Sequence, residues 1–177
     1  MAGDGPDRRR FLSIATCTVG GGLGLVIAAP LVRVILDPVG KQTVTTPREP
    51  IDLGPAERFG KNPKRVDVIA PVVKDGWMAA RNVVLGSAFI RRTGSGPKDL
   101  DARSGICPHL GCAVGWDRAQ NNYLCPCHDS RFAVNGDKLT GPSERGLDSL
   151  PIEVTRDGRL RLTWERYQVG RPTKERV

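Results

Sequence analysis

Aromatic residues are scarce in this sequence, and so is histidine. Aromatic side chains make up 5% of the 177 residues, which argues against a stacking platform for single-stranded nucleic acid. Beyond the N-terminal region, the basic residues behind the net charge of +8 are scattered, and because they form no nucleic-acid-binding motif, we expect no nucleic-acid partner. With 21 Gly and 14 Pro, the composition argues against a helical bundle and favours a loop-rich fold built of strands.

The two histidines of the chain lie in one short window, together with four of the five cysteines. His109 and His128 fall, with those four cysteines, between residues 107 and 128, whereas Cys17 stands alone near the N-terminus. Chance rarely gives such a distribution. The window from 107 to 128 is therefore the candidate functional site.

An uncharged stretch near the N-terminus is long enough to cross a membrane. Residues 11–32 carry no charge over 22 positions, and as a helix they would span about 33 Å, enough for the hydrocarbon core of a bilayer. Three arginines, residues 8–10, directly precede this stretch. Since positive charge tends to stay on the cytoplasmic side, we expect a cytoplasmic N-terminus and a head domain outside the cytoplasm.

The residues before this stretch also resemble a twin-arginine export signal. Residues 7–13, DRRRFLS, contain paired arginines followed, after one spacer residue, by two apolar residues. That route carries folded proteins, often with a cofactor inserted; an ordinary signal-anchor with three chance arginines is the alternative. Residues 28–30 make no convincing cleavage site, so we expect the apolar segment to be retained. Cys17 is then a small apolar filler within the membrane.

Beyond this stretch, the composition indicates a linker, a strand-rich head domain and a tail. Residues 37–62 are rich in Pro, Gly and charge with little periodicity, which is typical of a linker. The last residues are basic and polar, and they are expected to form a surface strap or a disordered end. The expected parts are a cytoplasmic N-terminus (1–10), a transmembrane anchor (11–36), a hinge or linker (37–62), a head domain (63–166) and a basic tail (167–177).

The head domain shows short apolar runs separated by turn signals, which is typical of an all-β fold. Gly86 leaves open whether the second run forms one strand or two, and Asp157-Gly158 between the last two runs is a strong hairpin signal. No long helical period appears in the head. The expected strands cover residues 65–73, 81–92, 122–124, 149–155 and 159–164.

The cysteine-rich window contains two short boxes. The first is C-P-H-L-G-C (107–112) and the second is C-P-C-H (125–128), with fifteen residues between His109 and Cys125. Such a set could bind zinc, form two disulfides, or hold a Rieske [2Fe–2S] centre, in which two Cys bind one iron, two His bind the other and two Cys remain free to pair. Each box offers a thiolate and an imidazole, and zinc sites usually contain C-x₂-C units, so the spacing favours the iron–sulfur centre.

At these boxes the chain resembles the Rieske iron–sulfur subunits of cytochrome bc-type quinol–cytochrome c oxidoreductases, whose boxes run close to C-T-H-L-G-C and C-P-C-H-G-S. The resemblance covers anchor, linker and head. It implies an antiparallel β-sandwich of the Rieske type with a small cluster-binding subdomain at about 104–144, preceded by one transmembrane helix. It also implies one [2Fe–2S] cluster bound by Cys107 and Cys125 on one iron and by His109 and His128 on the other, with a disulfide between Cys112 and Cys127.

The resemblance further implies a role in electron transfer. His128 is then the residue that contacts the quinol and accepts its proton, while one electron passes through the cluster to a cytochrome c-type haem. The implied partners are a cytochrome b subunit, a cytochrome c-type haem subunit and membrane quinol, within a dimeric complex of the bacterial inner membrane whose Rieske head lies on the periplasmic side. The chain would be a subunit of an oxidoreductase, and alone an electron carrier. The alternative is the small Rieske subunit of an exported molybdenum oxidase similar to arsenite oxidase.

Residues around the boxes bear on the reduction potential. By the same resemblance, Leu110 and a proline loop at Pro142 surround the cluster, and the hydroxyl of Ser130 can bond a cluster sulfur. Where the family commonly has H-G-S-x-Y, this chain has H-D-S-R-F, so Phe132 cannot supply the tyrosine hydroxyl and an ionised Asp129 adds negative charge. Hydrogen bonds to sulfur favour the reduced cluster. We therefore expect a lower potential than that of a ubiquinol-oxidising subunit, with menaquinol as the donor.

Overall fold

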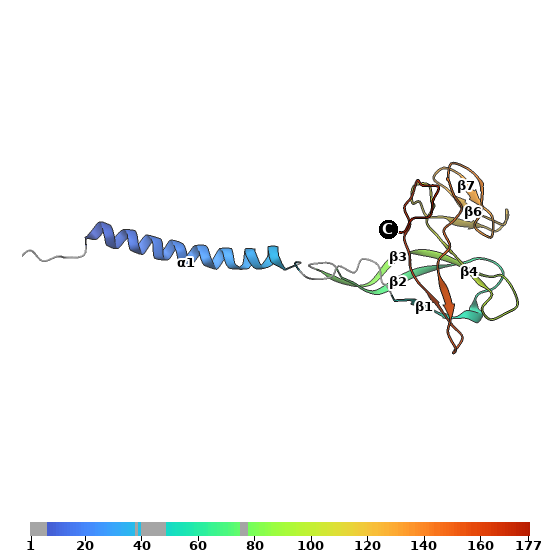
Figure 1. Cartoon of the computed structure of the whole chain (residues 1–177), viewed down its shortest axis with the longest axis horizontal. Coiled ribbons are helices and arrows are strands. Elements are labelled where there is room, and N and C mark those ends of the chain that lie inside the picture. Colours follow the sequence, from blue (N-terminus) through green and yellow to red (C-terminus); the bar gives the residue numbers. More distant parts are fainter. Residues whose placement is uncertain (1–6, 38, 40–48, 75–77) are drawn as a thin grey trace, which may run out of the picture. The chain divides into compact units, whose positions relative to one another are not determined.

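The computed structural model describes residues 7–37, 39, 49–74 and 78–177. It contains an N-terminal helix and a strand-rich head (Figure 1), which belong to two compact units. The first six residues of the expected N-terminus and most of the first half of the expected linker lie outside the described residues.

The N-terminal helix α1 (Arg8–Leu36) contains the uncharged stretch. The side chain of Asp7 accepts a hydrogen bond from the backbone N–H of Arg9 at 3.2 Å and so caps the first turn. Arg33 lies in the last turn, where a positive charge stabilises the helix through its interaction with the helix dipole. The helix is long and apolar enough to cross a membrane, and none of its residues is buried, as expected for a membrane anchor.

The described part of the head is all-β, with strands in three sheets and one short 3-10 helix, η1 (Ala56–Arg58). The first sheet has the order β1 (Ile51–Pro55), β10 (Arg159–Leu162), β9 (Ile152–Val154). The second has the order β2 (Lys64–Lys74), β3 (Ala79–Arg92), β4 (Leu100–Ser104). The third has the order β5 (Gly115–Asp117), β6 (Asn122–Cys125), β7 (Ser130–Phe132), β8 (Lys138–Thr140).

Two turn signals in the sequence have clear structural outcomes. β9 and β10 pair antiparallel across the Asp157-Gly158 turn, where Gly158 has a φ of 75°, so the predicted hairpin is confirmed. Gly86 does not break the second run, because β3 continues through it. A Cβ at Gly86 would lie 2.6 Å from Cη2 of Trp164, so this glycine allows the indole to pack directly against the strand.

Part of the expected linker is folded. Residues 51–58, which fall within the predicted linker at 37–62, form β1 and η1 in the structure. Leu53 is buried there, and Asp52 accepts a hydrogen bond from Nε of Arg159 at 2.6 Å. β1 is short and interrupted by glycine, and its partner β10 lies more than 100 residues further along the chain. The local composition therefore resembles a linker although the segment pairs in a sheet.

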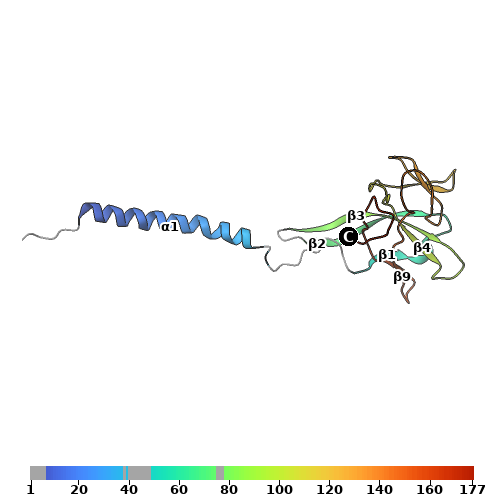
Figure 2. The same cartoon turned by 45° about the horizontal axis from the view of Figure 1, so that its top comes forward.

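Strand β3 belongs to two hydrophobic cores at once. Its residues Ala88 and Ile90 are buried in the core between the first and second sheets, which makes these two sheets a sandwich. Phe89 points to the opposite face, as alternation along a strand requires, and its ring meets Tyr123 edge-on at 5.0 Å. This second core carries the third sheet as a subdomain at one end of the head (Figures 1 and 2).

Candidate metal centre

The two boxes form two loops that lie beside each other on the subdomain. The second box is the connection between β6, which ends at Cys125, and β7, which begins at Ser130. The first box is a tight turn, closed by a hydrogen bond from the N–H of Gly111 to the carbonyl of Cys107 at 2.9 Å. Gly111 has a φ of 82°, a left-handed conformation that other residues adopt only with strain. The glycine of the first box is thus required by the turn.

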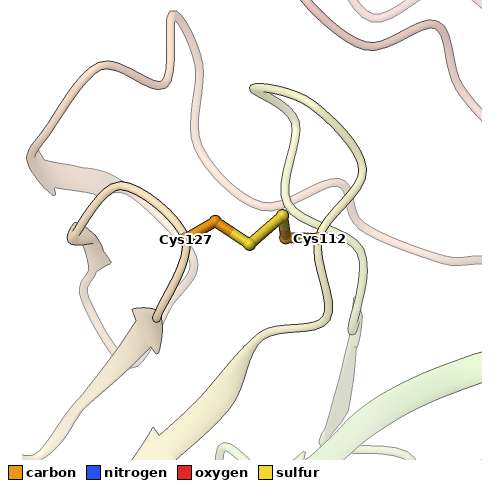
Figure 3. Close-up of a disulfide and its surroundings, with 2 residues drawn as sticks. All are labelled: Cys112 and Cys127. Atoms are coloured by element: carbon orange, nitrogen blue, oxygen red, sulfur yellow. A yellow bond between two sulfur atoms is a disulfide. The ribbon is translucent and has the colours of Figure 1, made fainter.

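A disulfide joins the two loops. Cys112 of the first box is bonded to Cys127 of the second, with 6.6 Å between their Cα atoms (Figure 3). Figure 3 shows the bond crossing from one loop to the other. Relative to each other, the loops are therefore held by a covalent bond as well as by the sheet.

The other two cysteines of the boxes are buried thiols. Cys107 is 1% exposed and Cys125 is 2% exposed, and neither takes part in a disulfide. Burial, together with the neighbouring Cys125 thiol, raises the pKa of the Cys107 thiol to about 11. A raised pKa favours the protonated thiol. A metal cation bound between the two thiols would reverse this preference, because it stabilises the thiolates.

The two histidines lie next to each other on the outer side of this pair. The ring centroids of His109 and His128 are 4.9 Å apart, with the rings nearly perpendicular. His109 is partly exposed and His128 is exposed, in contrast to the buried thiols. Leu110, between the first histidine and Gly111, is 60% exposed at the tip of its loop. In the two boxes, the imidazoles are therefore accessible to solvent, whereas the two free thiols are buried in the protein.

Three cysteines of the two boxes lie close enough together to form a metal-binding group by distance alone. The sulfur atoms of Cys112, Cys125 and Cys127 lie within 4.8 Å of one another. Since the first and the last of them form the disulfide, Cys125 is the free thiol of that group. The disulfide sulfurs are thus close neighbours of the free thiol but are not available as thiolate ligands.

A third loop, at residues 141–143, packs against the second box. Gly141 has a φ of 90°, and a Cβ there would collide with Cα of Ser130. The N–H of Ser143 donates to Oγ of Ser130 at 3.2 Å. Because Oγ accepts this bond, the fully buried hydroxyl of Ser130 retains its own proton to donate. The predicted proline loop thus approaches the second box, with Pro142 itself exposed.

The residues that depart from the family pattern lie on β7 and just before it. Phe132 is fully buried in the core of the subdomain and offers no hydroxyl. Asp129 has a φ of 55°, a left-handed conformation that suits the glycine common at this position in the family. Its carboxylate lies 3.4 Å from the guanidinium of Arg131, which offsets part of the negative charge.

Sequence reasoning missed a charged residue near the site whose side chain is largely buried. The side chain of Arg145 is 9% exposed and binds Asp148 as well as two backbone carbonyls of the C-terminal residues. Those C-terminal residues are ordered on the head. No pattern in the sequence could have indicated these contacts, because backbone carbonyls accept a guanidinium whatever the side chain of their residue is.

Comparisons with known proteins agree with this site. Residues 72–151 match the model of the Rieske [2Fe–2S] domain. The menaquinol:cytochrome c reductase iron–sulfur subunit of Geobacillus thermodenitrificans is 32% identical over 159 residues, covering 88% of this chain and 89% of the relative. The subunit of the same description from Bacillus subtilis is 33% identical, covering 88% and 90%. A chain of the solved hyperthermophilic respiratory Complex III is 24% identical, covering 84% of this chain and 97% of that one, with a TM-score of 0.43.

The donors present in the boxes fit a [2Fe–2S] group of this type. Such a centre needs two thiolates and two imidazoles, and the site offers two buried thiols outside any disulfide and two neighbouring imidazoles. All four donors lie within the matched residues 72–151.

Proposed function

Because the chain belongs to the family of Rieske iron–sulfur subunits of menaquinol:cytochrome c reductases and related cytochrome bc-type complexes, we propose that its two boxes supply all four ligands of one [2Fe–2S] cluster. In this proposal Cys107 and Cys125 bind one iron, and His109 and His128 bind the other. The burial of the two thiols and the exposure of His128 support this division. By itself the chain is an electron carrier, and it acts as an oxidoreductase within its complex.

The proposed role is to accept electrons from a quinol, menaquinol in particular, and to pass them to a cytochrome c-type haem. When bound, the cluster supplies one-electron transfer at a potential raised by its two neutral imidazole ligands. The single observation that carries the role is the exposed imidazole of His128 at the surface of the subdomain. Its position lets it contact a quinol hydroxyl and accept the proton that leaves with the electron.

We further propose that α1 is retained as the anchor, with the N-terminus in the cytoplasm and the head on the periplasmic side. Support comes from the three arginines at residues 8–10, which favour the cytoplasmic side. The disulfide between Cys112 and Cys127 suits the oxidising compartment outside. The expected linker would then let the head move between a cytochrome b subunit and a haem subunit of a dimeric membrane complex.

The proposed role can be tested by redox-titrated electron paramagnetic resonance (EPR) on the full chain in detergent, from pH 6 to pH 9. We expect a Rieske-type signal whose midpoint potential falls as pH rises, because electron uptake is linked to proton uptake at the histidines. A low potential in this series supports menaquinol, and a high one supports ubiquinol. A Rieske signal with a pH-independent potential would contradict the quinol-linked role.

The molybdenum oxidase alternative predicts a different partner. Purification of the tagged full chain from its native membrane should recover a cytochrome b subunit if the proposal is right. Recovery of a molybdenum-containing subunit in place of cytochrome b would favour the alternative.

Replacing Phe132 by tyrosine should raise the midpoint potential. The added hydroxyl can donate one hydrogen bond to the cluster region, and one such bond is worth about 1–1.5 kcal/mol. For one electron this corresponds to about 40–65 mV, at about 59 mV per tenfold change. The same redox titration measures the shift. Phe59→Tyr is the control, because it adds the same hydroxyl at a buried phenylalanine of the other core, and an equal shift in both variants would contradict a local hydrogen bond.

A further inference from the structure

The last residues of the chain form an ordered strap on the head. The C-terminal strap (166–177) folds back on itself, with hydrogen bonds from the N–H of Gln168 to the carbonyl of Glu175 and from the N–H of Val177 to the carbonyl of Arg166, both 2.9 Å. In Figure 1 this dark red segment runs from the end of β10 toward the subdomain that holds β6 and β7. The strap is therefore built to reach the boxes.

The tip of the strap touches the first box. The N–H of Gly170 donates to the carbonyl of Pro108 at 2.8 Å. Gly170 has a φ of 67°, and a Cβ at this position would lie 3.6 Å from the carbonyl oxygen of His109. Next to it, Cγ1 of Val169 lies 3.9 Å from where a Cβ of Gly111 would be. Since the carbonyl of Pro108 belongs to the peptide that leads into His109, the strap fixes the backbone directly before this histidine.

Arg145, two residues beyond the third loop, holds the tip of the strap. Its guanidinium donates to the carbonyl of Gln168 at 2.8 Å and to the carbonyl of Arg171 at 2.6 Å, on either side of Gly170. The same group binds the carboxylate of Asp148 through two bonds of 3.0 and 2.8 Å. A buried bidentate pair of this kind has a fixed orientation, so the strap is attached to a rigid support.

The same loop also reaches the second box. The hydroxyl of Ser143 donates to the carbonyl of Arg145 at 2.8 Å, and the N–H of Ser143 donates to Oγ of Ser130 at 3.2 Å. One hydrogen-bond network therefore runs from the first box through the strap and the third loop to the start of β7. Because the tip of the first box is exposed, it needs such external support to keep a single conformation.

We propose that the C-terminal strap and Arg145 are positioning elements for the first box. They fix the peptide before His109, so that its imidazole keeps the orientation needed for metal ligation. The inference rests on the proposed role of His109 as a ligand. The strap and Arg145 lie outside both boxes, and they act through the backbone of the first box rather than on the quinol.

Two variants test this role in the full chain with its cluster, in detergent. Arg145→Gln removes the guanidinium and with it the bonds that reach the strap. A chain ending at Arg166 removes residues 167–177 of the strap while leaving the bidentate pair with Asp148 intact. Arg171→Gln is the matched control, because it removes one positive charge within the strap but keeps the backbone carbonyl that takes part in the network. The measurements are the rate of cluster loss, the EPR line shape and hydrogen exchange at the amide of Gly111.

We expect both test variants to lose the cluster about tenfold faster than the wild type, which corresponds to about one net hydrogen bond. The EPR spectrum of the molecules that keep the cluster should broaden, because the imidazole samples several orientations, and the amide of Gly111 should exchange about tenfold faster. Arg171→Gln should match the wild type in all three, and Arg145→Lys should restore them only in part, since an ammonium cannot bridge the same acceptors.

Other outcomes would overturn the inference. Wild-type loss rate, line shape and exchange in both test variants would show that the strap does not position the box. An equal effect of Arg171→Gln would assign the change to lost charge and not to the hydrogen bonds. A wild-type chain that gives no Rieske signal at all would contradict the proposed function first, and the inference would fall with it.

Discussion

Replacing Cys125 with serine is expected to leave the full chain without its cluster. The thiol is 2% exposed at the end of β6, in contact with Cys107, so no other donor of the site can move into its place without unpacking the core of the subdomain. A serine hydroxyl stays protonated near neutral pH and is a poor ligand for iron. Iron and sulfide analysis, together with the EPR signal, should fall from the values of a [2Fe–2S] protein to background.

The fifth cysteine provides the control for this experiment. Cys17 lies in α1, away from both boxes in sequence, and Cys17→Ser should keep the full iron content and the full signal. Zinc measured in the same samples separates the two metal chemistries that the spacing left open. Full iron content in the Cys125→Ser chain would contradict the proposed ligand set, and stoichiometric zinc in the wild type would contradict the iron–sulfur centre itself.

The chemistry of the site could be predicted from the sequence because it is local. Each box places its donors within six residues, and a short loop can bring such near neighbours to one point whatever the rest of the chain does. The glycine of the first box also acts within its own loop, where it adopts the left-handed conformation that the turn needs. For the same reason the hairpin at Asp157-Gly158 and the apolar helix were predicted correctly, since turn chemistry and hydropathy are properties of adjacent residues.

The features that could not be predicted from the sequence depend on contacts between residues far apart in the chain. Whether Gly86 interrupts its strand depends on the indole of Trp164, which lies in another element. β1 looks like linker until β10 pairs with it. The strap and Arg145 are the clearest case, because the guanidinium binds backbone carbonyls. Such acceptors are present at every position of a chain, so no residue type or spacing marks the ones that are used.

Opening the disulfide should have the second-largest effect on the protein. The double variant Cys112→Ala/Cys127→Ala removes a link between positions 15 residues apart, and closing a loop of that length stabilises a fold by about 3 kcal/mol. We expect a guanidinium denaturation midpoint clearly below that of the wild type, followed through the fluorescence of the tryptophans. The double replacement is preferable to a single one because it leaves no unpaired thiol next to Cys125.

The cluster itself should be lost along with this stability, because the disulfide is the covalent link between the loop of His109 and the loop of His128. Without it, the two loops are joined by noncovalent contacts alone, and the two rings, now 4.9 Å apart, are free to separate. Treating the wild type with a phosphine reductant should reproduce both effects, since Cys127 is exposed, and the same treatment should leave the double variant unchanged. A reductant effect of equal size on both proteins would place the sensitive bond elsewhere. An unchanged denaturation midpoint in the double variant would mean that noncovalent contacts are enough to hold the loops together.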